Sequence, residues 1–235
     1  PRGFMKTIGL LGGMSWESTQ HYYRAINEGV NARLGKLHSA RVVLLSVDFQ
    51  PIEQLQQAGD WTAMAESLAA DARRVEAAGA DCLIICTNTM HKVADAVQAA
   101  VDIPLLHIAD ATGAALSNDG LSRVALLGTA FTMEQDFYRK RLQEVFNLDV
   151  LVPSAADRAT VHRVIYEELC KGEISADSRT AYLRIIEELA GRGAEAVILG
   201  CTEIGMLVSQ PDTAVPLYDT TAIHAARAVE FALAP

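Results

Sequence analysis

One stretch of this chain occurs twice. Residues 79–89 read GADCLIICTNT, and residues 193–203 read GAEAVILGCTE. Alignment of the two stretches places Thr87 against Cys201, at an offset of 114 (201 − 87). A repeat distance of this size is far longer than the unit of a solenoid, so it indicates a duplicated domain.

Two further pairs of segments repeat at nearly the same distance. IGLLG at 8–12 matches VALLG at 124–128, an offset of 116 (124 − 8). IPLL at 103–106 matches VPLY at 215–218, an offset of 112 (215 − 103). The duplication therefore extends over most of the chain and predicts two similar domains.

The secondary structure expected from the sequence alternates between strands and helices. Short apolar runs rich in β-branched residues suit parallel strands that are buried on both faces. Strands that alternate with amphipathic helices indicate βαβ units. The sequence therefore predicts an α/β fold of two pseudo-symmetric, doubly wound (flavodoxin-like) parallel-sheet domains. The expected strands are 6–11, 41–47, 82–86, 104–108, 123–128, 149–152, 196–200 and 215–218. The expected helices are 16–34, 60–78, 131–146, 157–171, 177–192 and 220–233.

The expected domain boundaries follow from the repeat. The first domain comprises residues 1–103 plus 215–235, and the second comprises 104–214. Ligands of such sheets bind outside the carboxyl ends of the strands, so we expect the active site in a cleft between the two domains. Residues 1–4 (PRGF) resemble the remainder of a vector-derived protease site, with Met5 as the natural start.

Composition argues against several classes of protein. A net charge of −9 disfavours a nucleic-acid partner, which requires clustered Lys and Arg. The longest apolar runs are too short to span a membrane, and no export signal opens the chain. The four cysteines lack the spacing of a metal site or of a disulfide framework. We therefore expect no metal site and a cytoplasmic location, with Cys82 and Cys86 as core residues.

Cys201 is the cysteine expected at a strand end, where a helix follows. Backbone N–H groups and the helix dipole at such a place lower the pKa of a thiol from about 8.5 towards neutrality. A thiolate there acts as a nucleophile or as a general base. The nucleophile reading requires a histidine partner, and His91, His107 and His224 are each candidates.

Three motifs resemble those of the aspartate/glutamate racemase superfamily. They are GLLGGMS at 9–15, CTNTMH at 86–91 and GCTEIG at 200–205. The resemblance runs from Met5 over essentially the whole chain, and it is closest to aspartate racemase-like and broad-specificity amino-acid racemases. It implies a cofactor-independent isomerase with two pseudo-symmetric α/β domains, acting as a homodimer on a small amino-acid substrate.

In that superfamily two cysteines flank the α-carbon of the substrate, one removing a proton and the other delivering one. By resemblance, Cys201 is the second cysteine and the base for the L-enantiomer. Thr87 holds the position of the first, since Asn88 and Thr89 match the Asn-Thr that follows it in the family. Cys86 is one residue early and points to the opposite face of a strand. The resemblance thus implies a Thr/Cys pair in place of two cysteines.

The binding residues are also inferred from the resemblance. Asn88, Thr89 and Thr202 resemble the groups that hold the α-carboxylate, while Met14 and Thr129 line the loops after the first strand of each domain. For the hydroxyl and amide side chains, helix capping is the competing role.

The group that binds the substrate side chain is harder to place. Family aspartate racemases use an Arg after the second strand and a Lys in the second domain. The corresponding stretch here, DFQPIEQLQQ at 48–57, has no Arg. In the second region, YEELCKG, Cys170 falls where the Lys is expected, with Lys171 beside it. Gln56 is the candidate in the first of these regions. L-Aspartate and L-glutamate are the favoured substrates, and broad specificity is the alternative.

Two other functions remain open from the sequence. An arylmalonate decarboxylase-like enzyme also keeps only the C-terminal cysteine, but it needs an apolar pocket for its aryl group. A solute-binding module also consists of two facing α/β domains, yet it has no use for a cysteine at a strand end.

Overall fold

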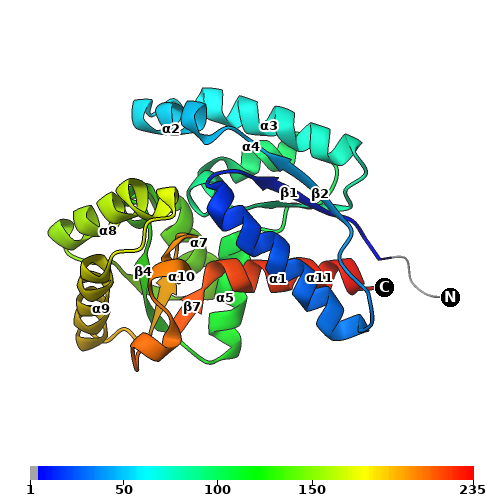
Figure 1. The fold of residues 1–235 in the computed structure, drawn as a ribbon. Coiled ribbons are helices and arrows are strands. Elements are labelled where there is room, and N and C mark those ends of the chain that lie inside the picture. Colours follow the sequence, from blue (N-terminus) through cyan, green and yellow to red (C-terminus); the bar gives the residue numbers. More distant parts are fainter. Residues whose placement is uncertain (1–4) are drawn as a thin grey trace. The chain divides into compact units, whose positions relative to one another are not determined.

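The computed structural model describes residues 5–235, which form two compact units. The first unit runs to Ile108 and resumes at His224, and the second comprises Ala109–Ile223. The expectation of an α/β fold with parallel sheets is confirmed (Figure 1). The expectation for residues 1–4 lies outside the described residues.

The first unit is built on a three-stranded parallel sheet with the order β2-β1-β3. α2 and α3 cover one face of this sheet, and α1 and α11 cover the other (Figure 1). Its strands are β1 (Ile8–Gly12), β2 (Val42–Ser46) and β3 (Cys82–Ile85). Its helices are α1 (Trp16–Leu34), α2 (Phe49–Ala58), α3 (Trp61–Ala77), the 3-10 helix η1 (Thr89–Val93), α4 (Ala94–Ala99) and the part of α11 (Thr220–Leu233) from His224 onwards.

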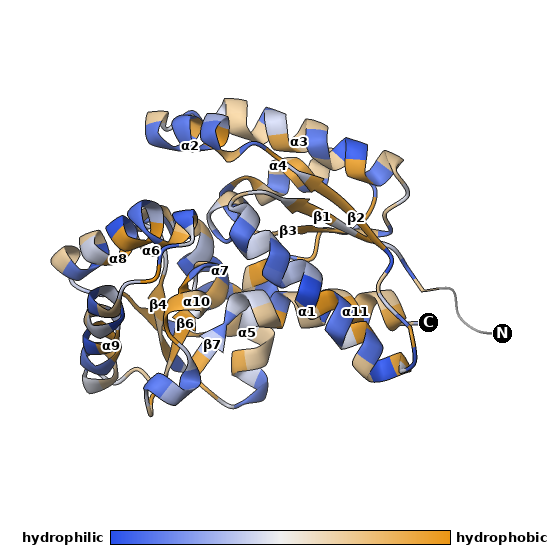
Figure 2. Ribbon diagram, viewed as in Figure 1, coloured by the Kyte–Doolittle hydropathy of each residue, from blue (hydrophilic) through white to orange (hydrophobic). Residues whose placement is uncertain are grey.

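Alternate residues of these strands enter two separate cores. Leu83 and Ile85 pack in the core beneath α3, whereas Cys82, Ile84 and Cys86 pack in the core beneath α1 and α11. Figure 2 shows the strands as predominantly apolar and the helices as two-sided. Cys82 and Cys86 are fully buried, as predicted, and burial raises the pKa of Cys82 to about 12.

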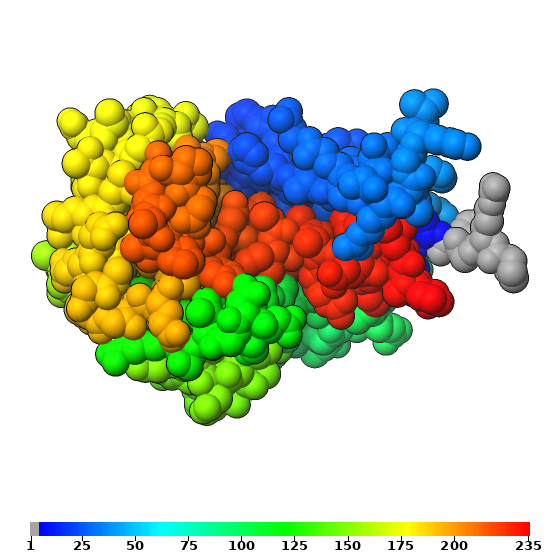
Figure 3. Space-filling view, turned by 90° about the horizontal axis from the view of Figure 1, so that it is seen from below, coloured from blue at the N-terminus to red at the C-terminus, as the bar shows by residue number. Residues whose placement is uncertain are grey.

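α1 and α11 run side by side on their face of the sheet. Val229 packs against Gly29, and the guanidinium of Arg33 lies 3.9 Å from the carboxylate of Glu230. Figure 3 shows the outer surfaces of the two helices next to each other, α1 in blue and α11 in red. The C-terminal residues therefore complete the core of the unit that the N-terminal strand begins.

The second unit is built on a four-stranded parallel sheet with the order β5-β4-β6-β7. Its strands are β4 (Arg123–Leu127), β5 (Asp149–Leu151), β6 (Ala196–Leu199) and β7 (Leu217–Asp219). Its helices are α5 (Ile108–Asn118), α6 (Ala130–Glu134), α7 (Asp136–Phe146), α8 (Ala155–Glu167), η2 (Leu169–Lys171), α9 (Ala176–Gly191), α10 (Ile204–Leu207), η3 (Gln210–Asp212) and the start of α11.

The two sheets share one register. Ile8 of β1 lies opposite Cys82 of β3, and Val124 of β4 lies opposite Ala196 of β6. The offsets between these equivalent residues are 116 (124 − 8) and 114 (196 − 82), the same offsets that the repeated sequence shows. The duplication is therefore visible in the pairing of the backbone itself.

The last paired segment of each sheet stays within its own unit. Leu83 bridges Leu105 in the first unit as Val197 pairs with Leu217 in the second. For this reason the chain crosses between units only after these segments. The sequence-based domains are 1–103 plus 215–235 and 104–214. The chain leaves the first unit after Ile108, five residues later than expected (108 − 103). It returns to the first unit after Ile223, nine residues later than expected (223 − 214).

Several helix ends agree with their sequence signals. The Ser15 side chain caps α1 by accepting from the Ser18 N–H, and Asp60 caps α3 in the same way through Ala63. Gly35 ends α1 with a φ of 72°. Four α-helices, α2, α4, α5 and α10, were not predicted from the sequence. The expected strand at 104–108 is reduced to one bridge, because α5 already begins at its last residue.

Within residues 5–235, no helix combines the length and the hydropathy that crossing a membrane requires.

Gly193 provides a direct test of the backbone at the start of the repeat. Gly79 and Gly193 both have a φ of 97°, a region that L-residues rarely adopt. Gly193→Ala is expected to lower the free energy of unfolding by about 1–2 kcal/mol, because alanine is strained at that φ. Denaturant titration of both proteins measures the difference.

Gly191→Ala is the matched control, two residues away at the end of α9, where a Cβ meets no atom. It is expected to leave stability unchanged or to raise it by up to about 1 kcal/mol. Equal losses for the two variants would contradict this explanation.

Candidate functional site

In the first unit, the polar residues Thr87, Asn88 and Thr89 follow β3 and are buried. The Cys86 N–H donates to the Leu11 carbonyl at 2.8 Å, which extends the pairing with β1 by one residue. The chain then turns into η1. The side chain of Cys86 lies in the core beneath α1, so it does not replace Thr87 at the strand end.

His91 holds the main chain of Thr87. Its Nδ1 lies 2.8 Å from the Thr87 carbonyl oxygen, and its Nε2 lies 3.2 Å from the backbone nitrogen of Ile108. Since Nε2 accepts from the Ile108 N–H, the neutral ring carries its proton on Nδ1 and donates it to Thr87. Burial, together with the nearby rings of His107 and His224, lowers the pKa of His91 well below its usual value.

His224 has a similar arrangement. Its Nε2 lies 2.6 Å from the Leu106 carbonyl oxygen, so this nitrogen carries the proton, and its Nδ1 accepts from the Tyr22 hydroxyl at 2.7 Å. Burial lowers the pKa of His224 to about 4. Both nitrogens of His91 and of His224 are thus engaged within the first unit, so neither ring has a nitrogen left to activate a thiol.

Met14 and Gln56 lie under the same strand-end loop. Met14 packs in the core beneath α3 with Ile52 and Met90. The Gln56 amide donates to the sulfur of Met90 at 3.1 Å. Met90 is the residue that follows Thr89 in the chain. The structure therefore joins the Gln56 side chain to the segment that carries Thr87, Asn88 and Thr89.

In the second unit, Cys201, Thr202 and Glu203 follow β6. The Cys201 thiol and the Thr202 hydroxyl both donate to Oε2 of Glu203, each at 2.9 Å. Cys201 is 7% exposed and Glu203 is 2% exposed. A thiol, a hydroxyl and a carboxylate thus form one buried cluster at a strand end.

The pKa of Cys201 is raised well above its ordinary value, first by burial and then by the negative charge of Glu203 and its hydrogen bond. The expectation that a following helix lowers this pKa is wrong. α10 begins only at Ile204 and has four residues, so its dipole is weak, while the Glu203 carboxylate is in direct contact. The resting side chain is therefore a thiol at neutral pH.

Thr129 lies at the neighbouring strand end of the same unit. Its hydroxyl caps α6 by accepting from the Thr132 N–H at 3.3 Å, which is the capping role. The Gly200 N–H donates to the Leu127 carbonyl at 2.6 Å, so the loops after β4 and β6 leave the sheet at the same edge. Across residues 5–235, no three His, Cys, Asp or Glu side chains are grouped to hold a metal ion.

Residues 11–228 match the Asp/Glu/hydantoin racemase family. The chain belongs to this family. The resemblance drawn from the three motifs is therefore confirmed, as is the expectation of an isomerase of the racemase class at the level of the family.

Solved structures and curated relatives agree with this assignment. An Asp/Glu racemase candidate from Yersinia pestis is 54% identical, with a TM-score of 0.91 over 98% of this chain and 100% of that one. An aspartate racemase homologue from Pyrococcus horikoshii is 34% identical, with a TM-score of 0.83 over 97% and 99%. The broad specificity amino-acid racemase RacX of Bacillus subtilis is 20% identical over 97% of this chain and 98% of RacX. The match to the curated glutamate racemases spans about half of their length (46%).

Glu203 was not among the candidates from the sequence, although a signal for it exists. It lies at offset 114 from Thr89 (203 − 89), a residue that was already a candidate. The residue type changes from a hydroxyl to an acid between the two copies, which hides the equivalence in the sequence.

Glu203→Gln tests the electrostatics of this cluster. Removal of the negative charge removes a cause of the raised Cys201 pKa, so the thiolate becomes more populated at a given pH. We expect the midpoint of the pH profile for iodoacetamide alkylation of Cys201 to move to lower pH. The measurement uses a Cys170→Ser background, because the other two cysteines are fully buried.

Glu173→Gln, an exposed change in the same unit, is the control and should leave the profile unchanged. A midpoint that rises in Glu203→Gln would contradict the assignment of the carboxylate as a cause of the high pKa.

Proposed function

We propose that this protein is an amino-acid racemase that inverts its substrate by α-proton transfer, with Cys201 as the base for the L-enantiomer and Thr87 on the opposite face. The observation that carries the proposal is the buried contact of the Cys201 thiol with Glu203, in the Gly-Cys-Thr motif of a racemase family. The proposal requires both side chains to reach one α-carbon.

Because the pKa of Cys201 is high, the thiol needs an acceptor for its proton before it can act as a base, and Glu203 is that acceptor in this proposal. The thiol passes its proton to the carboxylate, and the resulting thiolate removes the α-proton of the L-amino acid. The Thr87 hydroxyl then delivers a proton to the other face of the carbanion. One C–H bond breaks and one forms. Water takes the proton from Glu203 and restores the one lost by Thr87.

Thr87 makes the two faces unequal. A hydroxyl is a far weaker acid than a thiol, so Thr87 is a poor base for the D-enantiomer. Enantiomers have equal free energies in water, so inversion must have the same overall kcat/KM in both directions. Slow transfer at Thr87 therefore limits inversion both ways, while exchange of the L-substrate α-hydrogen at Cys201 stays fast.

The remaining polar residues bind the substrate in this proposal. Asn88, Thr89 and Thr202 hold the α-carboxylate, and the same donors stabilise the charge that develops as the proton leaves. Gln56, joined to the loop through Met90, contacts the substrate side chain. L-Aspartate and L-glutamate are the favoured substrates. The relation to RacX over nearly the whole chain supports broad specificity as the alternative.

The competing functions find less support. An aryl group requires an apolar surface next to the cysteine, whereas the Cys201 thiol donates to the Glu203 carboxylate, which also accepts from the Thr202 hydroxyl. A solute-binding module has no use for a buried thiol that is hydrogen-bonded to a carboxylate. Within residues 5–235 none of the four cysteines forms a disulfide, which is consistent with the reducing cytoplasm that we propose as the location.

Isotope exchange in D₂O tests the mechanism. We expect loss of the α-proton signal from the L-substrate to outrun inversion, and exchange from the D-substrate to be much slower. Cys201→Ala should reduce L-exchange by about 100-fold or more, because a positioned general base contributes that much. Thr87→Cys should accelerate inversion, because it places a thiol on the second face. NMR with a panel of L- and D-amino acids measures all of these rates.

Equal exchange rates from both enantiomers in the wild-type protein would contradict the proposed asymmetry. Full exchange by Cys201→Ala would contradict the assignment of the base. Release of CO₂ from a substituted malonate, in the absence of any exchange, would favour the decarboxylase.

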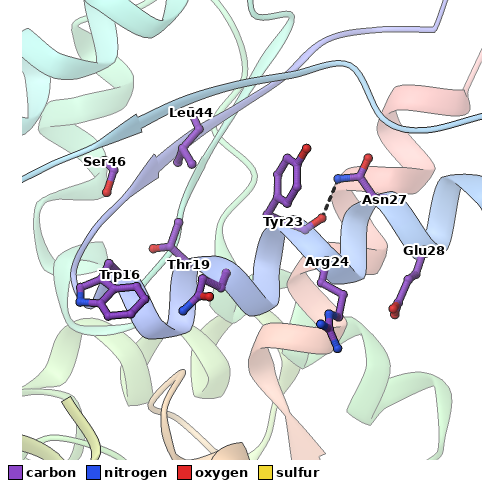
Figure 4. A pocket seen from close by; sticks show the side chains of 9 residues that line it. Trp16, Thr19, Tyr23, Arg24, Asn27, Glu28, Leu44 and Ser46 are labelled. Atoms are coloured by element: carbon purple, nitrogen blue, oxygen red, sulfur yellow. Dashed lines mark hydrogen bonds between the residues drawn. The ribbon is translucent and has the colours of Figure 1, made fainter. Parts of the chain in front are cut away.

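We further propose that the protein is a homodimer, with a surface groove of about 680 Å³ in the first unit as the interface (Figure 4). The groove lies between α1 and the edge strand β2 and exposes apolar side chains: Trp16 is 59% exposed, Tyr23 is 53% exposed and Leu44 is 42% exposed. An uncovered sheet edge with exposed apolar residues is a site for association.

Charge on the same groove favours a second copy of this chain as the occupant. Arg24 and Glu28 are exposed, lie one helical turn apart and form no ion pair within residues 5–235 (Figure 4). About a two-fold axis that sets two α1 helices antiparallel, Arg24 meets Glu28 of the partner subunit and the reverse pair forms as well. The surface is thus self-complementary.

Leu44→Lys tests this interface by placing a charge among the apolar residues. We expect the dimer dissociation constant, measured by sedimentation velocity, to rise at least about tenfold. Leu37→Lys is the control, since Leu37 is 98% exposed and lies outside the groove. A monomeric wild-type protein, or equal effects of the two changes, would contradict the assignment.

A further inference from the structure

The carbonyl of Thr87 is not part of the helix that follows it. In η1 the His91 N–H donates to Asn88 at 3.1 Å, a 3-10 bond, instead of reaching back one residue further to Thr87. The Nδ1–H of the His91 imidazole donates to the Thr87 carbonyl oxygen instead, at 2.8 Å. A side chain thus fixes a peptide group that the backbone ladder leaves out.

From this arrangement we infer that His91 is a positioning residue, which fixes the Thr87 peptide so that the Thr87 hydroxyl is aligned for proton transfer. The inference rests on the proposed function, because it gives His91 a role at only one of the two faces of the substrate. His91 itself does not touch the substrate in this role.

The other side of the ring is anchored as firmly. Nε2 of His91 accepts from the Ile108 N–H. The segment before Ile108 is itself paired with β3, since Leu106 donates to the Leu83 carbonyl at 2.9 Å. The imidazole therefore bridges two neighbouring segments that are each held by the sheet. Rotation of the ring breaks two buried hydrogen bonds, and a buried polar group that loses its partner destabilises the structure.

Two further histidines complete the packing of the ring. The centroids of His107 and His224 lie 4.5 Å and 5.8 Å from that of His91, and Tyr22 binds the far nitrogen of His224. These are the titratable groups that face His91. The bond from Ile108 requires Nε2 to be unprotonated, and the low pKa of the buried ring keeps it so. The cluster is thus a neutral support with one fixed tautomer.

The His91→Asn and His91→Gln pair tests the inference. The amide nitrogen of Asn reaches the position of Nδ1, so this variant keeps the donor to Thr87 and loses the acceptor for Ile108. The amide oxygen of Gln reaches the position of Nε2, so this variant keeps the acceptor and loses the donor. The two variants therefore each remove one of the two bonds, and only one of them leaves Thr87 unsupported.

We expect His91→Gln to reduce the kcat of D-substrate exchange by about 10- to 100-fold, since misplacement of a reacting group by about 1 Å has this cost. KM and L-substrate exchange should change by less than about threefold. His91→Asn should retain most of the D-exchange. His21→Asn, an exposed change on α1, is the control and should alter neither rate.

Amide hydrogen exchange gives a readout that does not depend on activity. His91→Gln should speed exchange in residues 87–91, while His91→Asn leaves this segment protected. Equal loss of L- and D-exchange in both variants, or unchanged protection of residues 87–91 in His91→Gln, would overturn the inference. If the wild-type protein shows no exchange that depends on Cys201, the proposed function fails, whereas amide protection still reports whether His91 holds the Thr87 peptide.

Discussion

The hydrogen bond between the Cys201 thiol and the Glu203 carboxylate governs the chemistry available to this protein. A carboxylate next to a buried sulfur opposes ionisation of the thiol, and the pKa of Cys201 is raised accordingly. The same oxygen atom is the nearest acceptor for the proton that the thiol must lose to become a base. The site therefore keeps a stable thiol at rest and holds the acceptor for its proton in contact. In the proposed mechanism, proton abstraction then depends on both residues, since a thiol with a raised pKa is seldom ionised at neutral pH unless an acceptor takes its proton.

The two copies of the fold have diverged at three equivalent positions. Thr87, Asn88 and Thr89 of the first unit correspond to Cys201, Thr202 and Glu203 of the second. In the second unit an acid contacts the reactive side chain directly. In the first unit His91 contacts the main chain of Thr87, at its carbonyl oxygen. Both sets of three residues therefore follow equivalent strands, β3 and β6. They differ in residue type, so one set carries a thiol and a carboxylate where the other carries two hydroxyls.

The sequence predicted the fold well because duplication constrains it. The offsets of 116 and 114 between the repeated segments recur as strand register, and seven of the eight expected strands form within a few residues of their expected bounds. Local patterns were less informative elsewhere. α2 contains Pro51 in its first turn, which is compatible with a helix but also reads as a loop signal. The 104–108 segment looked like a full strand, yet it pairs at one residue before α5 begins.

The candidate site was predicted in part, for a physical reason. Motifs identify residues by type and spacing, so Thr87 and Cys201 were found from their place in the repeat. The acidity of a thiol depends on burial and on neighbouring charge, and neither can be read from residue order. The sequence therefore suggested an activated cysteine, whereas the structure shows Glu203 raising its pKa. The support of Thr87 by His91 was likewise hidden, because it depends on a carbonyl that the helix does not use.

The path of the chain also affects how the molecule is made. The second unit is one continuous segment, whereas the first needs its final twelve residues (224–235), whose Ala228 and Val229 pack beside Ile8 and Leu10. During synthesis on the ribosome, residues 109–223 emerge as a complete sheet with its own helices. The apolar face that β1 turns towards α11 stays uncovered until the last helix leaves the exit tunnel. β1 precedes the other described strands in the chain, yet it is sealed from water only after α11 has been made.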